Sequence, residues 1–115
     1  MTAVELLLVA LGGAAGAPLR FVVGHRLDRA LPWGTLLVNV VGSTVLGALA
    51  ALALDGSAYA LLGTGFCGGL TTWSSFAVQT DRVGGARGAA YAVGTLVLSL
   101  LGCVLAFALV ASWGA

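Results

Sequence analysis

The sequence predicts an all-α integral membrane protein with four transmembrane helices. Of its 115 residues, 60% are hydrophobic and only 8% are charged, whereas soluble domains carry about 25% charged residues. The charged residues are also segregated, so that charge-free runs cover 30–54, 56–80 and 88–115. Each run exceeds the ~20 residues that an α-helix needs to cross a bilayer. A soluble chain of this length could not bury so much apolar surface, so we expect lipid to surround it.

The expected spans are about 3–24, 33–54, 58–79 and 88–112, within a single domain, 1–115. The first has Glu5 and no basic segment at its start, so it does not resemble a cleaved signal peptide. The second follows Pro32 and begins with Trp33, a residue type that is enriched at membrane interfaces. Glycines four residues apart, as in Gly12–Gly16 and Gly65–Gly69, predict helices that pack closely.

The third predicted span has an unusual composition for a helix. Residues 63–76 include four glycines and five serines or threonines. Glycine costs about 1 kcal/mol in a helix interior, and serine and threonine offer the backbone competing hydrogen bonds. We therefore expect a break near 68–74. Irregular backbone at membrane depth is tolerated only inside protein or beside an aqueous cavity, so a break there indicates an ion or substrate site.

Polar residues in two other spans are further candidates. Tyr91, Thr95 and Ser99 recur every four residues and share one face of the fourth span. The spacing alone fits a pore wall and an interhelical contact equally well. Arg20 lies near the end of the first span, and charges inside membranes are functional candidates. The alternative for Arg20 is snorkelling to the interface.

Several classes of function are disfavoured. The net charge of +1 makes nucleic acid an unexpected partner, and we find no metal-ligand spacing, nucleophile–base pair or phosphate site that would indicate an enzyme. A small proton-coupled exporter needs a carboxylate in the membrane, but all four acidic residues lie at predicted helix ends: Glu5, Asp28, Asp55 and Asp81. A non-conducting membrane assembly subunit would explain the glycines but not the clustered amide, hydroxyl and aromatic groups.

Three segments resemble the signature motifs of the CrcB/Fluc fluoride channel family. They are residues 12–20 (GGAAGAPLR), 34–43 (GTLLVNVVGS) and 65–76 (GFCGGLTTWSSF), in the family's order and spacing. The resemblance covers nearly the whole chain. It departs from the family pattern at Trp73, where phenylalanine is usual.

The resemblance implies a four-helix subunit of the cell membrane, from a bacterial source, that works as an antiparallel dimer with two fluoride pores. Toxic fluoride would leave the cell through them passively. A structural Na⁺ would sit at the dimer centre on the backbone carbonyls of Gly68 and Thr71. The family motifs place the pore lining on Asn39, Trp73, Ser75 and Phe76, to which we add the polar face of the fourth span, namely Tyr91, Thr95 and Ser99. Arg20 would be a vestibule or structural charge.

These residue types suit fluoride, which is small and strongly hydrated. A pore must replace the lost water with donors and still let the ion leave. The amide of Asn39 and the hydroxyl groups are neutral donors. Aromatic rings carry positive edges, so Phe76 can turn its edge to an anion, and Trp73 adds an indole N–H.

The arginines of the loops bear on how the dimer forms. Arg26, Arg29, Arg82 and Arg87 all belong to the first and third loops, which four spans place on one side of the membrane, and the opposite side has no Lys or Arg. This bias predicts a fixed orientation with those loops in the cytoplasm. A fixed orientation would require an antiparallel homologous partner of opposite bias. The alternative is that the helices insert either way and the chain pairs with itself.

Overall fold

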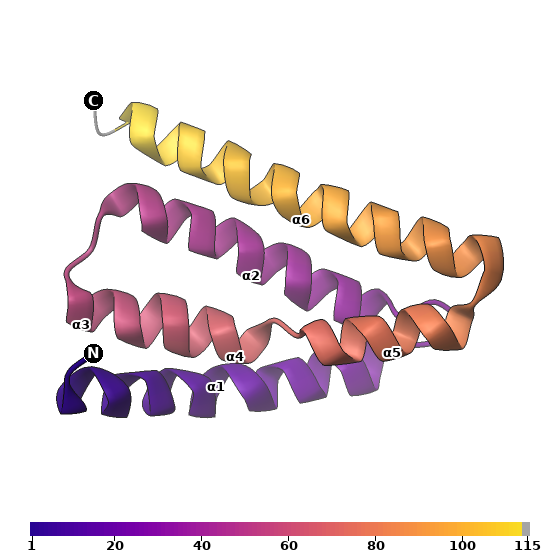
Figure 1. The fold of residues 1–115 in the computed structure, drawn as a ribbon, viewed down its shortest axis with the longest axis horizontal. Helices are drawn as coiled ribbons and strands as arrows, with labels where there is room; N and C mark the ends of the chain where they lie inside the picture. The colour runs from indigo at the N-terminus through magenta and orange to yellow at the C-terminus, as the bar shows by residue number, and fades with distance from the viewer. Residues whose placement is uncertain (114–115) are drawn as a thin grey trace.

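The structure is a computed structural model, in which residues 1–113 are described and are all-helical. Its elements are α1 (Ala3–Leu27), α2 (Trp33–Leu52), α3 (Gly56–Tyr59), a π-helical segment (Ala60–Cys67), α4 (Gly68–Leu70), α5 (Trp73–Val83) and α6 (Gly85–Trp113). Four antiparallel segments result, because α3, the π-helical segment, α4 and α5 follow one line (Figure 1). The α1–α2 and α5–α6 connections lie at one end, as predicted, and the N-terminus and the α2–α3 connection lie at the other.

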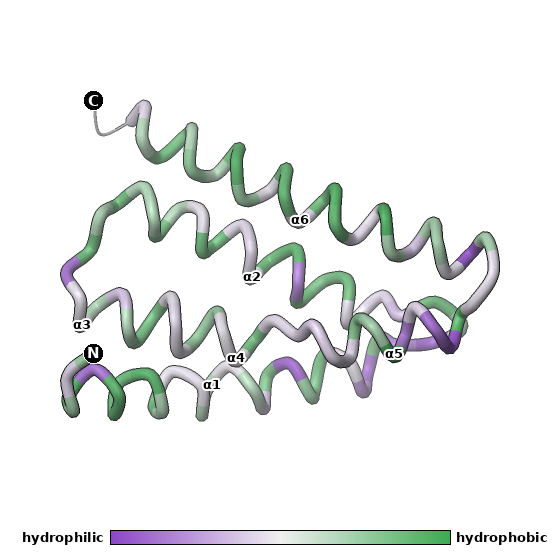
Figure 2. Tube along the Cα trace, viewed as in Figure 1, coloured by the Kyte–Doolittle hydropathy of each residue, from purple (hydrophilic) through white to green (hydrophobic). Residues whose placement is uncertain are grey.

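Three helices are long and apolar enough to cross a membrane, namely α1, α2 and α6. Apolar residues run along them, and hydrophilic residues gather toward the end that holds the α1–α2 and α5–α6 connections (Figure 2). The predicted boundaries were short for α1, which continues to Leu27, and for α6, which begins at Gly85. Gly84 and Gly85 make the turn before α6 with φ of 65° and 58°, a backbone region that glycine adopts without steric cost.

The third segment is not a single helix. After α4, Thr71 and Thr72 have extended backbone, with φ and ψ of −82° and 158° and of −151° and 125°. Before α4, eight residues form the π-helical segment, which the sequence did not lead us to expect. π-Helical turns are rare in proteins, and those that occur often lie at functional sites. The extended residues and the π-helical segment therefore set the third segment apart from α1, α2 and α6.

The predicted close packing at glycines is confirmed. An added Cβ on Gly69 would lie 2.9 Å from the Cα of Gly13, and one on Gly65 would lie 3.1 Å from the Cα of Gly12. Real Cβ atoms essentially never show the first distance, and the second is unusually short, so α1 and the third segment touch backbone to backbone. The contact fixes the third segment on one side and leaves its other side toward α2 and α6.

Large apolar side chains lie mostly outside. Leu6, Leu100 and Leu109 are 58%, 66% and 67% exposed, while small residues such as Cys67 and Ala60 fill the interior. A soluble protein would reverse this arrangement, because exposed apolar patches are limited in size. The exposed surface therefore fits a hydrocarbon solvent.

Candidate functional site

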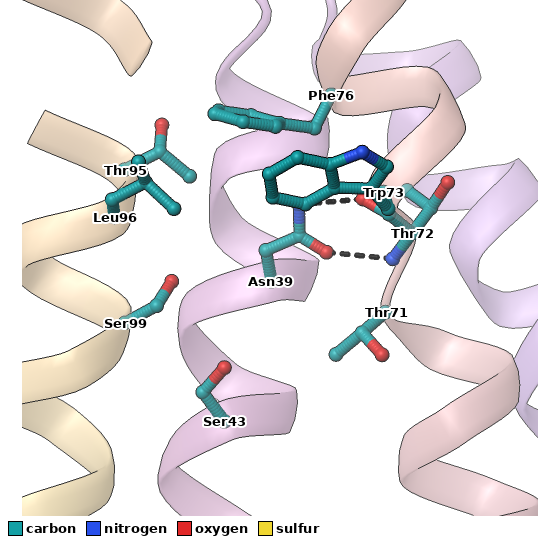
Figure 3. Close-up of a pocket in the computed structure, with 9 residues that line it drawn as sticks. All are labelled: Asn39, Ser43, Thr71, Thr72, Trp73, Phe76, Thr95, Leu96 and Ser99. Atoms are coloured by element: carbon teal, nitrogen blue, oxygen red, sulfur yellow. Dashed lines mark hydrogen bonds between the residues drawn. The ribbon is translucent and has the colours of Figure 1, made fainter. Parts of the chain in front are cut away.

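A cavity of about 240 Å³ lies beside the interruption of the third segment. Figure 3 shows side chains entering it from three elements, with Thr95 and Ser99 on α6 projecting toward Asn39 and Ser43 on α2. The lining residues are Asn39, Ser43, Thr71, Thr72, Trp73, Phe76, Thr95, Leu96 and Ser99, and none of these carries a charge. We call this space the neutral cavity.

Asn39 holds the interrupted backbone in place. Its Nδ2 donates to the carbonyl oxygen of Thr72 at 3.0 Å, and its Oδ1 accepts from the N–H of Thr72 at 2.7 Å (Figure 3). In a continuous α-helix that N–H would bond to the carbonyl of Gly68. Asn39 therefore satisfies the buried backbone of the break, and one N–H of its amide remains for another acceptor.

Thr72 is a residue of this site that our sequence analysis did not single out. It is 8% exposed, and its hydroxyl accepts from the N–H of Ser75 at 3.1 Å, which caps the start of α5. Threonine is a preferred residue at this position, so a threonine directly before a helical restart was the signal available. The cap and the Asn39 bonds together fix where α5 begins.

Phe76 is the buried aromatic residue of the site and is 6% exposed. Its ring centroid lies 5.4 Å from that of Trp73 and 5.7 Å from that of Tyr91, and both pairs are tilted. Trp73 is 71% exposed, so its indole reaches the surface of this single chain. The two aromatic residues of the motif thus have different surroundings.

The hydroxyl groups of α6 differ in whether their proton already takes part in a hydrogen bond. Thr95 is buried and donates its proton to the carbonyl of Tyr91 at 2.7 Å. The hydroxyls of Tyr91 and Ser99 are buried and have no hydrogen-bond partner within residues 1–113. Because a hydroxyl has one proton, Ser99 keeps an unused donor at the neutral cavity and Thr95 does not.

A second cavity, of about 350 Å³, shares Thr72 with the neutral cavity as a lining residue. Its charged or ionisable lining residues are Arg20, His25 and Asp28, and Ser75 and Gln79 line it as well. Asp28 is engaged, since its Oδ1 and Oδ2 accept from the backbone N–H and the hydroxyl of Thr35, both at 2.9 Å. We call this space the charged cavity.

Gly68 and Thr71 lie together at a third cavity, of about 370 Å³, which faces α2 residues Gly42 and Ser43. Gly68 is exposed in the single chain. The N–H that would normally cover its carbonyl is the one that Thr72 gives to Asn39. This end of α4 therefore offers carbonyl oxygens without a helical partner.

Comparison with known proteins places the chain in a family. Residues 7–111 match the family model described as CrcB-like protein, Camphor Resistance (CrcB). The chain belongs to the CrcB family. One relative is a protein of Nocardia farcinica named "Fluoride-specific ion channel FluC 1", 44% identical over 96% of this chain and 82% of the relative. Another, from Rhodococcus jostii and named "Fluoride-specific ion channel FluC 2", is 54% identical over 65% of this chain and 68% of the relative.

A relative from Halobacterium salinarum, also named "Fluoride-specific ion channel FluC 1", is 48% identical over 89% of this chain and 87% of the relative. These names describe ion channels and not enzymes. Together with the apolar helices, the matches show that this CrcB-family chain is a multi-pass membrane protein.

The structure brings most of the predicted pore residues of this CrcB-family chain to one place. The neutral cavity collects Asn39, Trp73, Phe76, Thr95 and Ser99, and it is also lined by Thr71, which we predicted as a sodium ligand. Two predicted pore residues lie elsewhere: Ser75 lines the charged cavity with Arg20, and Tyr91 lines a separate groove between α2 and α6. Tyr91 still contacts the site through Phe76.

Proposed function

We propose that this chain is a subunit of a fluoride-specific channel that lets fluoride leave the cell passively across the cell membrane. The observation that carries the proposal is the neutral cavity, in which amide, hydroxyl and aromatic groups meet beside interrupted backbone without a charged side chain. The names of the curated relatives support the same ion. The neutral cavity fits conduction, because an ion must bind well enough to enter and weakly enough to leave.

The donors of the neutral cavity have separate roles in this proposal. The free hydroxyl of Ser99 and the second N–H of Asn39 replace water around the ion. Phe76 presents the edge of its ring, where aromatic rings are positive. Since Thr95 gives its proton to its own helix, it shapes the wall and does not donate to the ion.

The third segment crosses the membrane in this proposal, with Thr71 and Thr72 at membrane depth. Exposed backbone in hydrocarbon would cost several kcal/mol per group. Asn39 and the threonine cap satisfy the N–H and C=O of Thr72 and the N–H of Ser75. These bonds keep the backbone of Thr72 and the N–H of Ser75 from facing lipid unpaired, and the carbonyls at the end of α4 remain for the proposed ion.

The proposed assembly is an antiparallel dimer with a structural Na⁺ between the subunits. Two residues fit the ion, because the end of α4 presents the carbonyls of Gly68 and Thr71, and hard cations prefer oxygen ligands. A second subunit would add the same pair of carbonyls. Bound Na⁺ would supply a fixed positive charge that holds these carbonyls together.

Substitutions at two neighbouring glycines test dimer assembly and folding of the single chain separately. A Cβ on Gly68 would find its nearest neighbour, the carbonyl oxygen of Gly63, at 4.0 Å, whereas one on Gly69 would clash with Gly13 of α1. Gly68→Val should therefore leave the single chain folded and disrupt the dimer, and Gly69→Val should unfold the chain itself. Circular dichroism and light scattering in detergent distinguish the two. A Gly68→Val protein that dimerises like the wild type contradicts the proposed contact.

The partner in the dimer is a second copy of this chain or a homologous subunit. Arg29 lies in the α1–α2 connection, and Arg26, Arg82 and Arg87, which we expected in loops, lie in the helix turns beside the two connections at the same end. Their position still favours one orientation, and that favours a homologous partner of opposite bias. A C-terminal reporter fusion expressed alone in cells tests it. A single orientation supports the homologous partner, and an even mixture of two orientations supports the homodimer.

Liposomes loaded with fluoride test the function itself. With this protein in the membrane, equal pH on both sides and a potassium ionophore to balance charge, fluoride should flow out and a fluoride electrode should detect it. A proton-coupled exporter would need a pH gradient for the same flux. Flux only with a pH gradient, or no flux when a verified partner subunit is present, contradicts the channel.

A further inference from the structure

An apolar groove of about 270 Å³ lies between the beginning of α2 and the beginning of α6. It shares no residue with the neutral cavity or the charged cavity. Leu31, Leu36 and Gly94 contribute apolar surface, and Trp33 and Arg87 are exposed at its lining. We call it the α2–α6 groove.

The groove has a charged part and an apolar part. Arg87 is the third residue of α6, and Gly94 lies seven residues further along the same helix, about 10 Å deeper. Trp33 is the first residue of α2 and is 54% exposed. Tryptophan and arginine at the ends of membrane helices lie at headgroup level, so the groove runs from the headgroups into the acyl region.

Arginines outnumber acidic residues at the end of the molecule that holds the groove, where Asp28 and Asp81 also lie. Arg26 and Arg29 belong to the same end of the molecule as Arg87. Arg82 lies there too, but its guanidinium is occupied, with Nε donating to Gln79 at 2.7 Å and a terminal nitrogen donating to the carbonyl of Arg29 at 3.0 Å. Arg87 is the exposed arginine that lines the groove.

We propose that the α2–α6 groove is a binding site for one anionic phospholipid. The phosphate and anionic headgroup bind Arg87 beside Trp33, and an acyl chain lies along Leu36 toward Gly94. Basic pockets between membrane helices bind anionic headgroups in this way, because each nearby Lys or Arg attracts them. The bound lipid also contacts Tyr91, which lines the groove and packs on Phe76.

Two variants test the two ends of the site. Arg87→Gln removes the charge and keeps most of the side chain. Gly94→Leu fills the deep end, and it should fold, because a Cβ at Gly94 has no atom within 4 Å and leucine favours a helix more than glycine does. Arg26→Gln is the matched control, since Arg26 is an exposed arginine at the same end that does not line the groove.

Native mass spectrometry of the purified protein, titrated with phosphatidylglycerol or phosphatidylcholine, measures the lipid retained. We expect phosphatidylglycerol to be retained with about tenfold higher affinity. Arg87→Gln and Gly94→Leu should each lose most of this preference, while Arg26→Gln stays within about twofold of the wild type.

Three results would overturn the proposal. The first is equal retention of the two lipids by the wild-type protein, and the second is an equal loss in Arg26→Gln and Arg87→Gln, which indicates diffuse charge and no site. In the third, Gly94→Leu changes the monomer–dimer equilibrium and leaves lipid retention unchanged, because the groove is then an interface between subunits.

Discussion

The neutral cavity and the charged cavity share Thr72 as a lining residue, but the chemical types of their other lining residues differ. The neutral cavity, about 240 Å³, has an amide, hydroxyls and aromatic rings. The charged cavity, about 350 Å³, has Arg20, His25 and Asp28. In the proposed channel this difference would separate two tasks, since a fixed positive charge attracts anions from a distance and neutral donors replace water without holding the ion.

Thr72 takes part in both cavities because its backbone is not helical. Its N–H and C=O are turned to Asn39 on the side of the neutral cavity, and its residue also lines the charged cavity. The break in the third segment thus forms the wall between the two spaces. Changes at this wall should have the largest effect on transport, and changes in the charged cavity the smallest.

The largest effect is expected from a negative charge in the neutral cavity. Asn39→Asp keeps the shape but cannot donate to the carbonyl of Thr72, and its carboxylate repels an anion. Two unit charges 4 Å apart interact by about 4 kcal/mol at an effective dielectric constant near 20, so fluoride efflux from liposomes should fall about a hundredfold or more. Fluoride efflux within threefold of the wild type would show that Asn39 does not line the fluoride pathway.

An intermediate effect is expected from the hydroxyls of α6. Ser99→Ala deletes an unused donor and should lower fluoride efflux by about fivefold, the value of one hydrogen bond of about 1 kcal/mol. Thr95→Val deletes a hydroxyl that already bonds to the carbonyl of Tyr91 and should stay within about twofold. The comparison fails if Thr95→Val is the more damaging of the two.

The smallest effect is expected in the charged cavity. Arg20→Gln should lower fluoride efflux by about threefold in dilute buffer, and the loss should shrink at about 0.5 M salt, because salt screens long-range attraction. The control is Arg26→Gln, an exposed arginine outside both cavities. A large loss that persists in high salt means that Arg20 holds the fold or contacts the ion directly.

Hydropathy and charge segregation were enough to predict the all-helical fold, because lipid leaves few alternatives. The glycine spacing also predicted the close packing of α1 on the third segment, as the contact of Gly69 with Gly13 shows. The π-helical segment at Ala60–Cys67 was not predicted. Its residues have no local signal that separates π-helical from α-helical hydrogen bonds, and tertiary packing decides between them.

The sequence predicted most of the residues that line the neutral cavity, but not the hydrogen bonds between them. Motif positions and four-residue spacing selected Asn39, Phe76, Thr95 and Ser99, which do meet in the neutral cavity. Residue spacing cannot show that the side-chain amide of Asn39 bonds to the backbone of Thr72, since these two residues are 33 positions apart in the sequence. Nor can it show that Tyr91 lies in the α2–α6 groove, because a helix face is wide enough to touch two cavities.

The fluoride-to-chloride selectivity of Arg20→Gln tests most directly whether the neutral cavity selects the ion. Efflux of each anion is measured from matched liposomes for the wild type and the variant. If neutral donors select fluoride, the variant conducts less but its fluoride-to-chloride ratio stays within about twofold of the wild type. If the ratio falls toward one, the charge of Arg20 selects the ion and the division of tasks between the two cavities is wrong.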